Sequence, residues 1–202
     1  MKLIYLIIFI FIIGVNILAF NSIKTDPPNQ TNTNVAEEIL FFEDFSSDVS
    51  SEITFLDFDQ LLPTNYSQIA SYWQIITSEN KCIGISSWLT DHSQANDWII
   101  LPEIELKDNS FLIWKSKSKS SYNTENYKVL ISTVNPITTD IDTTNFISIK
   151  EFFENSTNFV ENYLDLKEYK NQKVWIAIKY CSKSKRYLYF DDIKVTNFIG
   201  TD

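Results

Sequence analysis

Two acidic doublets framed by aromatic residues are the first candidates for chemistry in this sequence. Glu43 and Asp44 lie in the segment FFEDF, and Asp191 and Asp192 lie in the segment YLYFDDIKV. Side chains of a strand alternate between its two faces, so a regular strand would place one carboxylate of each doublet among apolar residues, where an unpaired charge is costly. If the two segments pair, several carboxylates converge and repel one another unless a cation lies between them. Carboxylate and carbonyl oxygens are the ligands that Ca²⁺ prefers.

The same residues allow a purely structural arrangement. In this alternative, one carboxylate of each doublet faces the solvent and the other bonds to a lysine or to a loop amide. The spacing of the acidic residues is not that of an EF-hand loop, so the residues alone leave both interpretations open.

The elements that would position these carboxylates are short strands separated by turns. The candidate strands are rich in β-branched and aromatic residues, with turn segments such as SENK and KDNS between them. They span residues 39–45, 72–77, 82–88, 97–105, 110–117, 126–133, 145–152, 159–166, 173–181 and 186–197. A turn of helix is expected at 56–62 or at 166–170. About ten short strands without alternating helices predict an all-β fold, an antiparallel β-sandwich with jelly-roll topology, in which the first and last strands are neighbours.

The composition fits one soluble domain with a packed core. The chain has 202 residues, of which 44% are hydrophobic and 15% aromatic, and its formal net charge is −9. This charge argues against nucleic acid and anionic membrane surfaces as partners, because both attract a basic face. Cations remain suitable ligands.

The N-terminal segment is typical of export. A lysine precedes an apolar run from Leu3 to Phe20, so residues 1–20 are expected to form a removed signal peptide or, in the alternative, a retained membrane anchor. Either one places the remainder in the cell envelope, at the cell surface or outside the cell. Residues 21–38 are rich in Asn, Thr and Pro, which indicates a disordered spacer. The folded domain is expected over residues 39–198.

Cys82 and Cys181 lie in the exported part, where oxidising conditions permit a disulfide. Such a bridge would close a loop of roughly 100 residues and stabilise the fold by roughly a few kcal/mol. In the alternative, each cysteine is a small residue of the core.

Three segments together carry a family resemblance. They are NDWIILP, from Asn96 to Pro102, then the run YLDLKEYKNQKVWIAIKY, and finally the terminal DDIKV. Their order and spacing resemble the cleaved adhesin domains, also called choice-of-anchor J domains, which are MAM-like β-jelly rolls of exported bacterial surface proteins. The resemblance runs from about Ile39 to Phe198.

The resemblance implies a lectin-like sandwich that binds a glycan or a protein ligand without catalysis. Some members of the family hold a structural Ca²⁺ near the paired terminal strands. Carried over to this sequence, the ligands would be Glu43 and Asp191, with Asp44 and Asp192 as weaker candidates.

One segment departs from the family pattern. Many members have an acidic loop punctuated by glycines, and here the segment LDFDQLLPTNY, from Leu56 to Tyr66, stands in its place without a glycine. This departure argues against a second cation and against a ligand site built on the loop.

Trp88 and Trp175 are the candidates for contact with a ligand. Trp88 precedes the polar loop LTDHSQAN, and Trp175 points to the opposite face of its strand from Val174 and Ile176. In the alternative, both tryptophans fill the core, as is expected of most tryptophans within strands.

Catalytic motifs are missing from the sequence. His92 is the only histidine and lies in a polar loop, and no serine stands in a Gly-x-Ser-x-Gly elbow. The sequence therefore predicts an exported, non-catalytic adhesion or binding module for a glycan or a protein. Two alternatives are an accessory domain or glycoside-active enzyme with paired carboxylates, and a structural envelope protein tethered by an uncleaved N-terminal segment.

Overall fold

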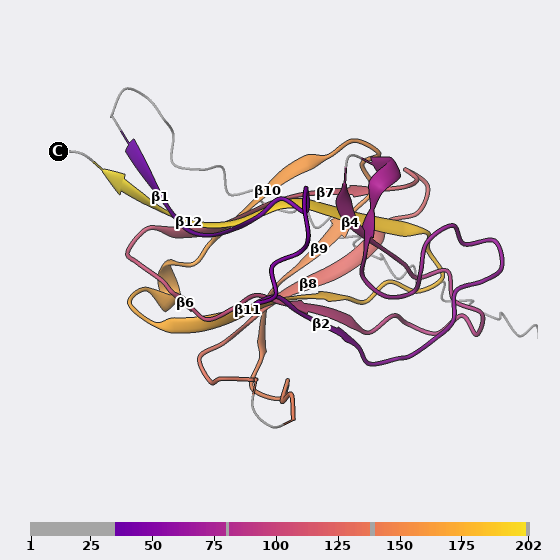
Figure 1. Cartoon of the computed structure of the whole chain (residues 1–202), viewed down its shortest axis with the longest axis horizontal. Coiled ribbons are helices and arrows are strands. Elements are labelled where there is room, and N and C mark those ends of the chain that lie inside the picture. Colours follow the sequence, from indigo (N-terminus) through magenta and orange to yellow (C-terminus); the bar gives the residue numbers. More distant parts are fainter. Residues whose placement is uncertain (1–34, 80, 138–139, 201–202) are drawn as a thin grey trace, which may run out of the picture.

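The computed structural model describes residues 35–79, 81–137 and 140–200. Within these ranges the chain forms strands and two single turns of 3₁₀ helix (Figure 1). The strands are β1 (Val35–Glu43), β2 (Thr54–Asp57), β3 (Gln74–Ile76), β4 (Cys82–Ser86), β5 (Asp97–Ile100), β6 (Ile104–Glu105), β7 (Ser110–Ser118), β8 (Glu125–Ser132), β9 (Ile147–Glu154), β10 (Val160–Asp165), β11 (Lys173–Tyr180) and β12 (Tyr187–Gly200). The helical turns are η1 (Thr77–Glu79) and η2 (Lys167–Tyr169).

The strands form two six-stranded sheets that pack face to face. The first sheet has the order β10-β7-β12-β4-β3, with β1 paired to β12. The second sheet has the order β2-β5-β11-β8-β9, with β6 paired to β11. The pairs are antiparallel throughout. The predicted all-β, antiparallel sandwich with jelly-roll character is therefore confirmed.

The core follows from the alternation of residues along the central strands. In β11, the side chains of Val174, Ile176, Ile178 and Tyr180 enter the main core, whereas Trp175 packs in a separate cluster on the outer face of the second sheet. This is the pattern expected of a strand with both faces covered.

Aromatic rings pack against one another at the centre of this core. The ring of Phe152 lies 4.9 Å from that of Trp114 and 5.2 Å from that of Tyr127, and Phe190 lies 4.9 Å from Tyr127 on its other side. The rings of Tyr127 and Phe152 are stacked and the other two pairs meet edge to face, and such contacts add about 0.5–1.5 kcal/mol each beyond the burial of apolar area.

The pairing of the first and last strands is confirmed. β1 runs antiparallel to β12, with Glu43 opposite Ile193 and Val35 opposite Gly200. The two strands continue as a ribbon beyond the body of the sandwich (Figure 1). Residues 35–38, which the composition assigned to the spacer, belong to this ribbon. The predicted signal segment and residues 21–34 of the spacer lie outside the described residues.

A β-bulge explains how β12 carries two adjacent carboxylates. The register of β12 against β7 shifts between Asp191 and Lys194, and Asp192 has a positive φ of 48°. The core residues of β12 next to the doublet are Phe190 and Ile193, so the extra residue of the bulge lets both carboxylates avoid the core. The expectation that one aspartate would share a face with Ile193 in a regular strand was therefore wrong.

Two other local expectations change. The predicted helical turn at 56–62 is wrong, because residues 54–57 form β2 at the edge of the second sheet. The predicted strand 97–105 is divided into β5 and β6. The proline at position 102 lies in the break, where its missing N–H removes a ladder bond. The turn expected at 166–170 is found as η2.

The predicted disulfide between Cys82 and Cys181 is not formed. Cys82 is buried on the outer face of the first sheet, in a cluster with Tyr187 and Tyr189. Cys181 follows the inward residue Tyr180 and lines a pocket on the outer face of the second sheet. Outer faces of two stacked sheets are separated by more than about 10 Å, whereas a disulfide needs Cα atoms within about 7 Å.

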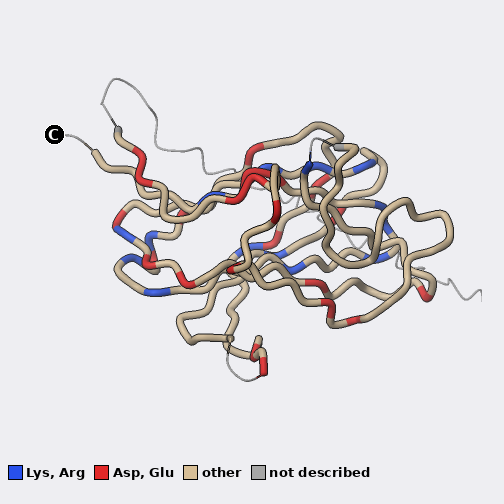
Figure 2. The backbone as a smooth tube through the Cα atoms, in the orientation of Figure 1, with Lys and Arg blue, Asp and Glu red and all other residues tan. Residues whose placement is uncertain are grey.

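The surface charge is mixed. Acidic and basic positions are interspersed along the backbone (Figure 2). In the described part of the chain, no helix is long and apolar enough to span a bilayer.

Candidate functional site

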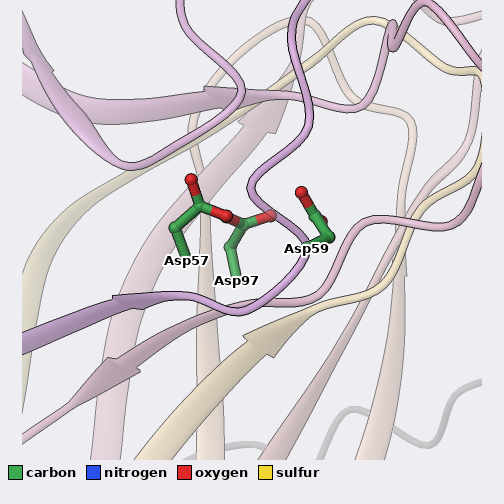
Figure 3. Close-up of side chains that lie close together, drawn as sticks. All are labelled: Asp57, Asp59 and Asp97. Atoms are coloured by element: carbon green, nitrogen blue, oxygen red, sulfur yellow. The ribbon is translucent and has the colours of Figure 1, made fainter.

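Three aspartates from separate segments meet at one end of the second sheet. Asp57 ends β2, Asp59 lies in the loop that follows, and Asp97 begins β5. Asp57 and Asp97 are cross-strand partners. One oxygen of each of the three carboxylates lies within 4.8 Å of the others, and the side chains gather at the same point (Figure 3).

Asp97 is the unusual member of this cluster. Its residue is only 1% exposed, and within the described residues neither of its carboxylate oxygens has a hydrogen-bond partner. Burial, followed by the negative charges of Asp59 and Asp57, raises the pKa of Asp97 to about 9. An unpaired buried carboxylate beside two like charges requires either a proton or a cation.

The loop after β2 holds the other two carboxylates in place. Asp57 Oδ1 accepts a hydrogen bond from the backbone N–H of Gln60 at 2.6 Å. Asp59 Oδ1 accepts from Leu61 N–H at 3.0 Å, and its Oδ2 accepts from Asn96 N–H at 2.6 Å. Gln60 has a positive φ of 51°, which closes the turn without a glycine. Each of these carboxylates keeps oxygen lone pairs available toward Asp97.

The donor set fits a hard divalent cation. Ca²⁺ binds oxygen ligands at about 2.3–2.6 Å, so two oxygens on one ion lie at most about 5 Å apart. The 4.8 Å limit on the three carboxylate oxygens meets this condition. Asp57, Asp59 and Asp97 would hold the ion, and its positive charge would compensate the buried carboxylate of Asp97.

The same loop continues from the aspartates to an aromatic pair on the surface. Thr64 N–H donates to the carbonyl of Trp88 at 2.8 Å, and Thr90 N–H donates to the carbonyl of Leu62 at 3.1 Å. Tyr66 stacks on Trp88 with ring centres 6.1 Å apart and an angle of 26° between the planes. Tyr66 is 79% exposed, so the stacked pair presents a ring to the solvent. We call Tyr66 and Trp88 the aromatic platform.

Of the two tryptophans predicted to contact a ligand, only Trp88 is at the surface. Trp88 is partly exposed, and the Arg186 guanidinium lies 5.2 Å from its ring centre. Trp175 is only 7% exposed and belongs to a cluster on which Ile141 and Phe146 pack. The prediction for Trp175 is corrected, because side chains that precede β9 cover its face of the sheet.

Both carboxylate oxygens of Glu43 accept backbone hydrogen bonds. Its Oε1 accepts from Phe45 N–H at 2.8 Å, and its Oε2 accepts from Ser50 N–H at 2.9 Å. Asp44 Oδ1 accepts from Ser46 N–H at 2.9 Å. This is the loop-amide arrangement that stood as the structural alternative for this doublet.

The second doublet forms an ion pair. Asp192 lies 2.5 Å from Lys115 Nζ, and Asp191 accepts the backbone N–H of Asp192 at 2.9 Å. Partial burial, together with the charge of Asp192 and, more weakly, that of Asp44, raises the pKa of Asp191 to about 6. Within the described residues, the four predicted ligands do not gather as Asp57, Asp59 and Asp97 do. A cation at the terminal strands therefore stays a prediction.

The sequence interpretation missed the aspartate cluster. The spacing of Asp57 and Asp59, with one residue between them, was a usable signal, because such a pair in a turn can direct both carboxylates to one point. The absence of glycine suggested that the loop had lost this ability. The segment from Asn96 to Pro102 was used as evidence for the fold, and the sequence interpretation gave its Asp97 no functional role.

Comparison with known proteins gives a likeness at the level of structure. No family model matches the sequence, and no curated protein matches it. The K3 cleaved adhesin domain of Lys-gingipain from Porphyromonas gingivalis has a TM-score of 0.60 at 16% identity, covering 80% of this chain and 99% of that domain. The K2 domain of Lys-gingipain has a TM-score of 0.57 at 15% identity, covering 79% of this chain and 99% of that domain.

A carbohydrate-binding module shares the architecture as well. The C-terminal family 22 carbohydrate binding module of Clostridium thermocellum Xyn10B has a TM-score of 0.50 at 6% identity, covering 81% of this chain and 97% of the module. At these identities the likeness concerns the fold. The chain therefore has the fold of the cleaved adhesin domains, as its ordered segments predicted.

Proposed function

We propose that this protein is an exported, non-catalytic binding module whose aromatic platform contacts a glycan and whose loop is held by Ca²⁺. The observation that carries the proposal is Asp97, a buried carboxylate with no described hydrogen-bond partner that faces two further aspartates. The fold shared with adhesin domains and with a carbohydrate binding module supports a binding role.

The position of the cluster links the cation to the platform. Asp59 is bonded to both Leu61 and Asn96, so it joins the start of the loop to the residue before β5. The loop then runs to Tyr66, which stacks on Trp88. A cation shared by Asp57, Asp59 and Asp97 would fix this loop at its origin and so order the platform before a ligand arrives. Such ordering reduces the entropy lost on binding.

The buried carboxylates inside the sandwich support a non-catalytic role. Glu125 and Glu154 are cross-strand partners and are 0% and 7% exposed. Glu125 accepts from Tyr180 Oη at 2.6 Å, and Glu154 accepts from Ser116 Oγ at 2.5 Å. A sugar ring has no access to carboxylates that are enclosed in this way. A glycosidase would need its pair in an open cleft.

Glycan-array binding of the full chain tests the proposal. Tyr66→Ala and Trp88→Ala are expected to lose at least about tenfold in affinity for any glycan bound, because a stacked ring supplies much of the apolar contact to a sugar. Tyr122→Ala is the matched control, since Tyr122 is 95% exposed and lies outside the platform. Binding that survives both platform substitutions, or no glycan binding at all with or without calcium, would contradict the proposal.

A protein ligand is the second candidate. Leu62 and Tyr72 are 72% and 54% exposed and lie in the same segment of the chain as Tyr66, so this segment presents more apolar side chains to the solvent than the aromatic platform alone. A pull-down from envelope proteins with wild type and Leu62→Ser would favour this candidate if the substitution abolished capture while glycan binding was absent.

Export itself is tested by mass spectrometry of the mature N-terminus. An intact Met1 in membrane fractions would favour tethering by an uncleaved N-terminal segment.

A further inference from the structure

Two lysines stand directly opposite each other on the outer face of the second sheet. Lys128 of β8 and Lys179 of β11 are cross-strand partners, and like charges in such positions repel. Lys179 is in turn the cross-strand partner of Trp98, and its ammonium nitrogen lies 5.1 Å from the centre of the Trp98 ring. Glu151 of β9 is the cross-strand partner of Lys128 on its other side, and its Oε1 accepts a hydrogen bond from Asn126 Nδ2 at 2.8 Å.

This pair is only partly compensated, because one carboxylate, that of Glu151, faces Lys128, whereas Lys179 faces Trp98. The ion pairs found among the described residues include neither Lys128 nor Lys179. The chain as a whole has a formal net charge of −9. Two adjacent ammonium groups that repel each other favour an anion between them, because an anion converts the repulsion into two attractive contacts.

A pocket lies where such an anion would bind. It has a volume of about 360 Å³ and is lined by Lys128, Lys179, Gln94, Ala95, Asn96 and Cys181. The volume is within the range of small-molecule sites. The loop residue Gln94 is fixed by a 2.7 Å bond from its Nε2 to the carbonyl of Cys181.

Neutral amides accompany the two charges. Asn96 Oδ1 accepts from Trp98 Nε1 at 3.0 Å, which leaves the NH₂ group of Asn96 as a donor at the pocket. Gln94 keeps its Oε1 as an acceptor for the same reason. The pocket therefore combines two ammonium donors for an anion with an amide donor and an amide acceptor for hydroxyl groups.

We propose that this pocket binds the carboxylate of an acidic sugar, such as a uronic acid residue of a polysaccharide. The ammonium groups of Lys128 and Lys179 would bind the carboxylate, and Gln94 and Asn96 would bond to ring hydroxyls. An acidic peptide offers the carboxylate but lacks the hydroxyls that suit the amides. The proposal rests on the proposed function in that the ligand is a glycan, but its residues are separate from Tyr66 and Trp88.

Calorimetric titration of the full chain with tetragalacturonate tests the proposal. Lys128→Gln and Lys179→Gln are each expected to weaken binding by about tenfold, because each removes one charge-assisted contact. Lys173→Gln is the control: it makes the same change in net charge on the same strand, and Lys173 pairs with Glu103 outside the pocket. The control is expected to bind within about twofold of wild type, and each variant is checked for an unchanged melting temperature.

The probes separate this proposal from the function on which it rests. A neutral galactose tetramer is expected to bind at least about tenfold more weakly than tetragalacturonate. Equal binding of the two sugars, wild-type affinity in both pocket variants, or tighter binding of a tetraglutamate peptide would overturn the acidic-sugar site. If glycans still bind in a manner that depends on Tyr66 and Trp88, the proposed function stands while this inference falls. If no glycan binds, both fall.

Discussion

Replacing Asp97 by Asn should have opposite effects in the presence and absence of calcium. Without a cation, the buried carboxylate of Asp97 is unfavourable, and its pKa is raised to about 9. With Ca²⁺ bound to Asp57, Asp59 and Asp97, the same carboxylate becomes a ligand and stabilises the fold. The neutral amide of Asp97→Asn relieves the first effect and removes most of the second. The variant is therefore expected to be more stable than wild type with chelator, and to gain little from calcium.

The magnitude follows from the pKa shift. The ordinary pKa of an aspartate is 3.8, and in the chelated protein the folded state holds its proton up to a pH of about 9. The stability that this proton provides is fully present below pH 4 and is lost as the pH rises towards 9. Each pKa unit corresponds to about 1.4 kcal/mol, so wild type in chelator should lose about 4 kcal/mol between pH 4 and pH 7 through this group.

Calcium should offset more than half of this loss in wild type at neutral pH. Ca²⁺ at 100 times its dissociation constant adds about 2.7 kcal/mol, or about 5–10 °C in melting temperature for a chain of this size. Thermal denaturation from pH 4.5 to 9, with calcium or with chelator, measures both effects. Asp108→Asn is the control, since its side chain is 71% exposed. A wild type that is indifferent to calcium, or an Asp97→Asn variant that is less stable than wild type in chelator, would refute the reasoning.

Three further predictions concern the fold. Gly84→Ala should destabilise by about 1–3 kcal/mol in chemical denaturation, because a Cβ there would lie 2.8 Å from an isoleucine side chain and 2.9 Å from a tyrosine ring. Gly200→Ala, whose Cβ meets nothing within 4 Å, should change stability by less than about 0.5 kcal/mol, and equal losses would contradict the packing argument. Glu43→Gln should cost about 1–3 kcal/mol by replacing an acceptor of a backbone N–H, with the calcium dependence unchanged. Loss of that dependence would instead favour a cation at the terminal strands. Cys82 and Cys181 should both react with a thiol reagent in denaturant without reductant, and a mass showing no modification would indicate a disulfide after all.

The fold was predictable because its strands follow one rule along most of their length. β7, β8 and β11 alternate between the core and the outer face with period 2, and their β-branched and aromatic residues are typical of strands. The pairing of β1 with β12 was predicted from the jelly-roll topology, in which the first and last strands are neighbours. The alternation of residues within a strand and the order of strands along the chain can both be read from the sequence.

The aspartate cluster was not predictable in the same way. Asp57 meets Asp97 only because β2 pairs with β5 in one particular register. β2 has four residues, too few for its alternation to be recognised, so the pairing had no signal in the sequence. The positive φ values of Gln60 and Asp192 also have no glycine to mark them. Trp175 was misassigned because a loop, rather than the strand pattern, covers it.

The ribbon of β1 and β12 has a mechanical consequence. Val35 and Gly200 are partners in register at the same end of the antiparallel pair. A stretching load applied between these two positions would act across the ladder and break its hydrogen bonds one pair at a time, as in a zipper, instead of shearing them together. The ribbon would yield at low force and lengthen before the sandwich itself carried any tension.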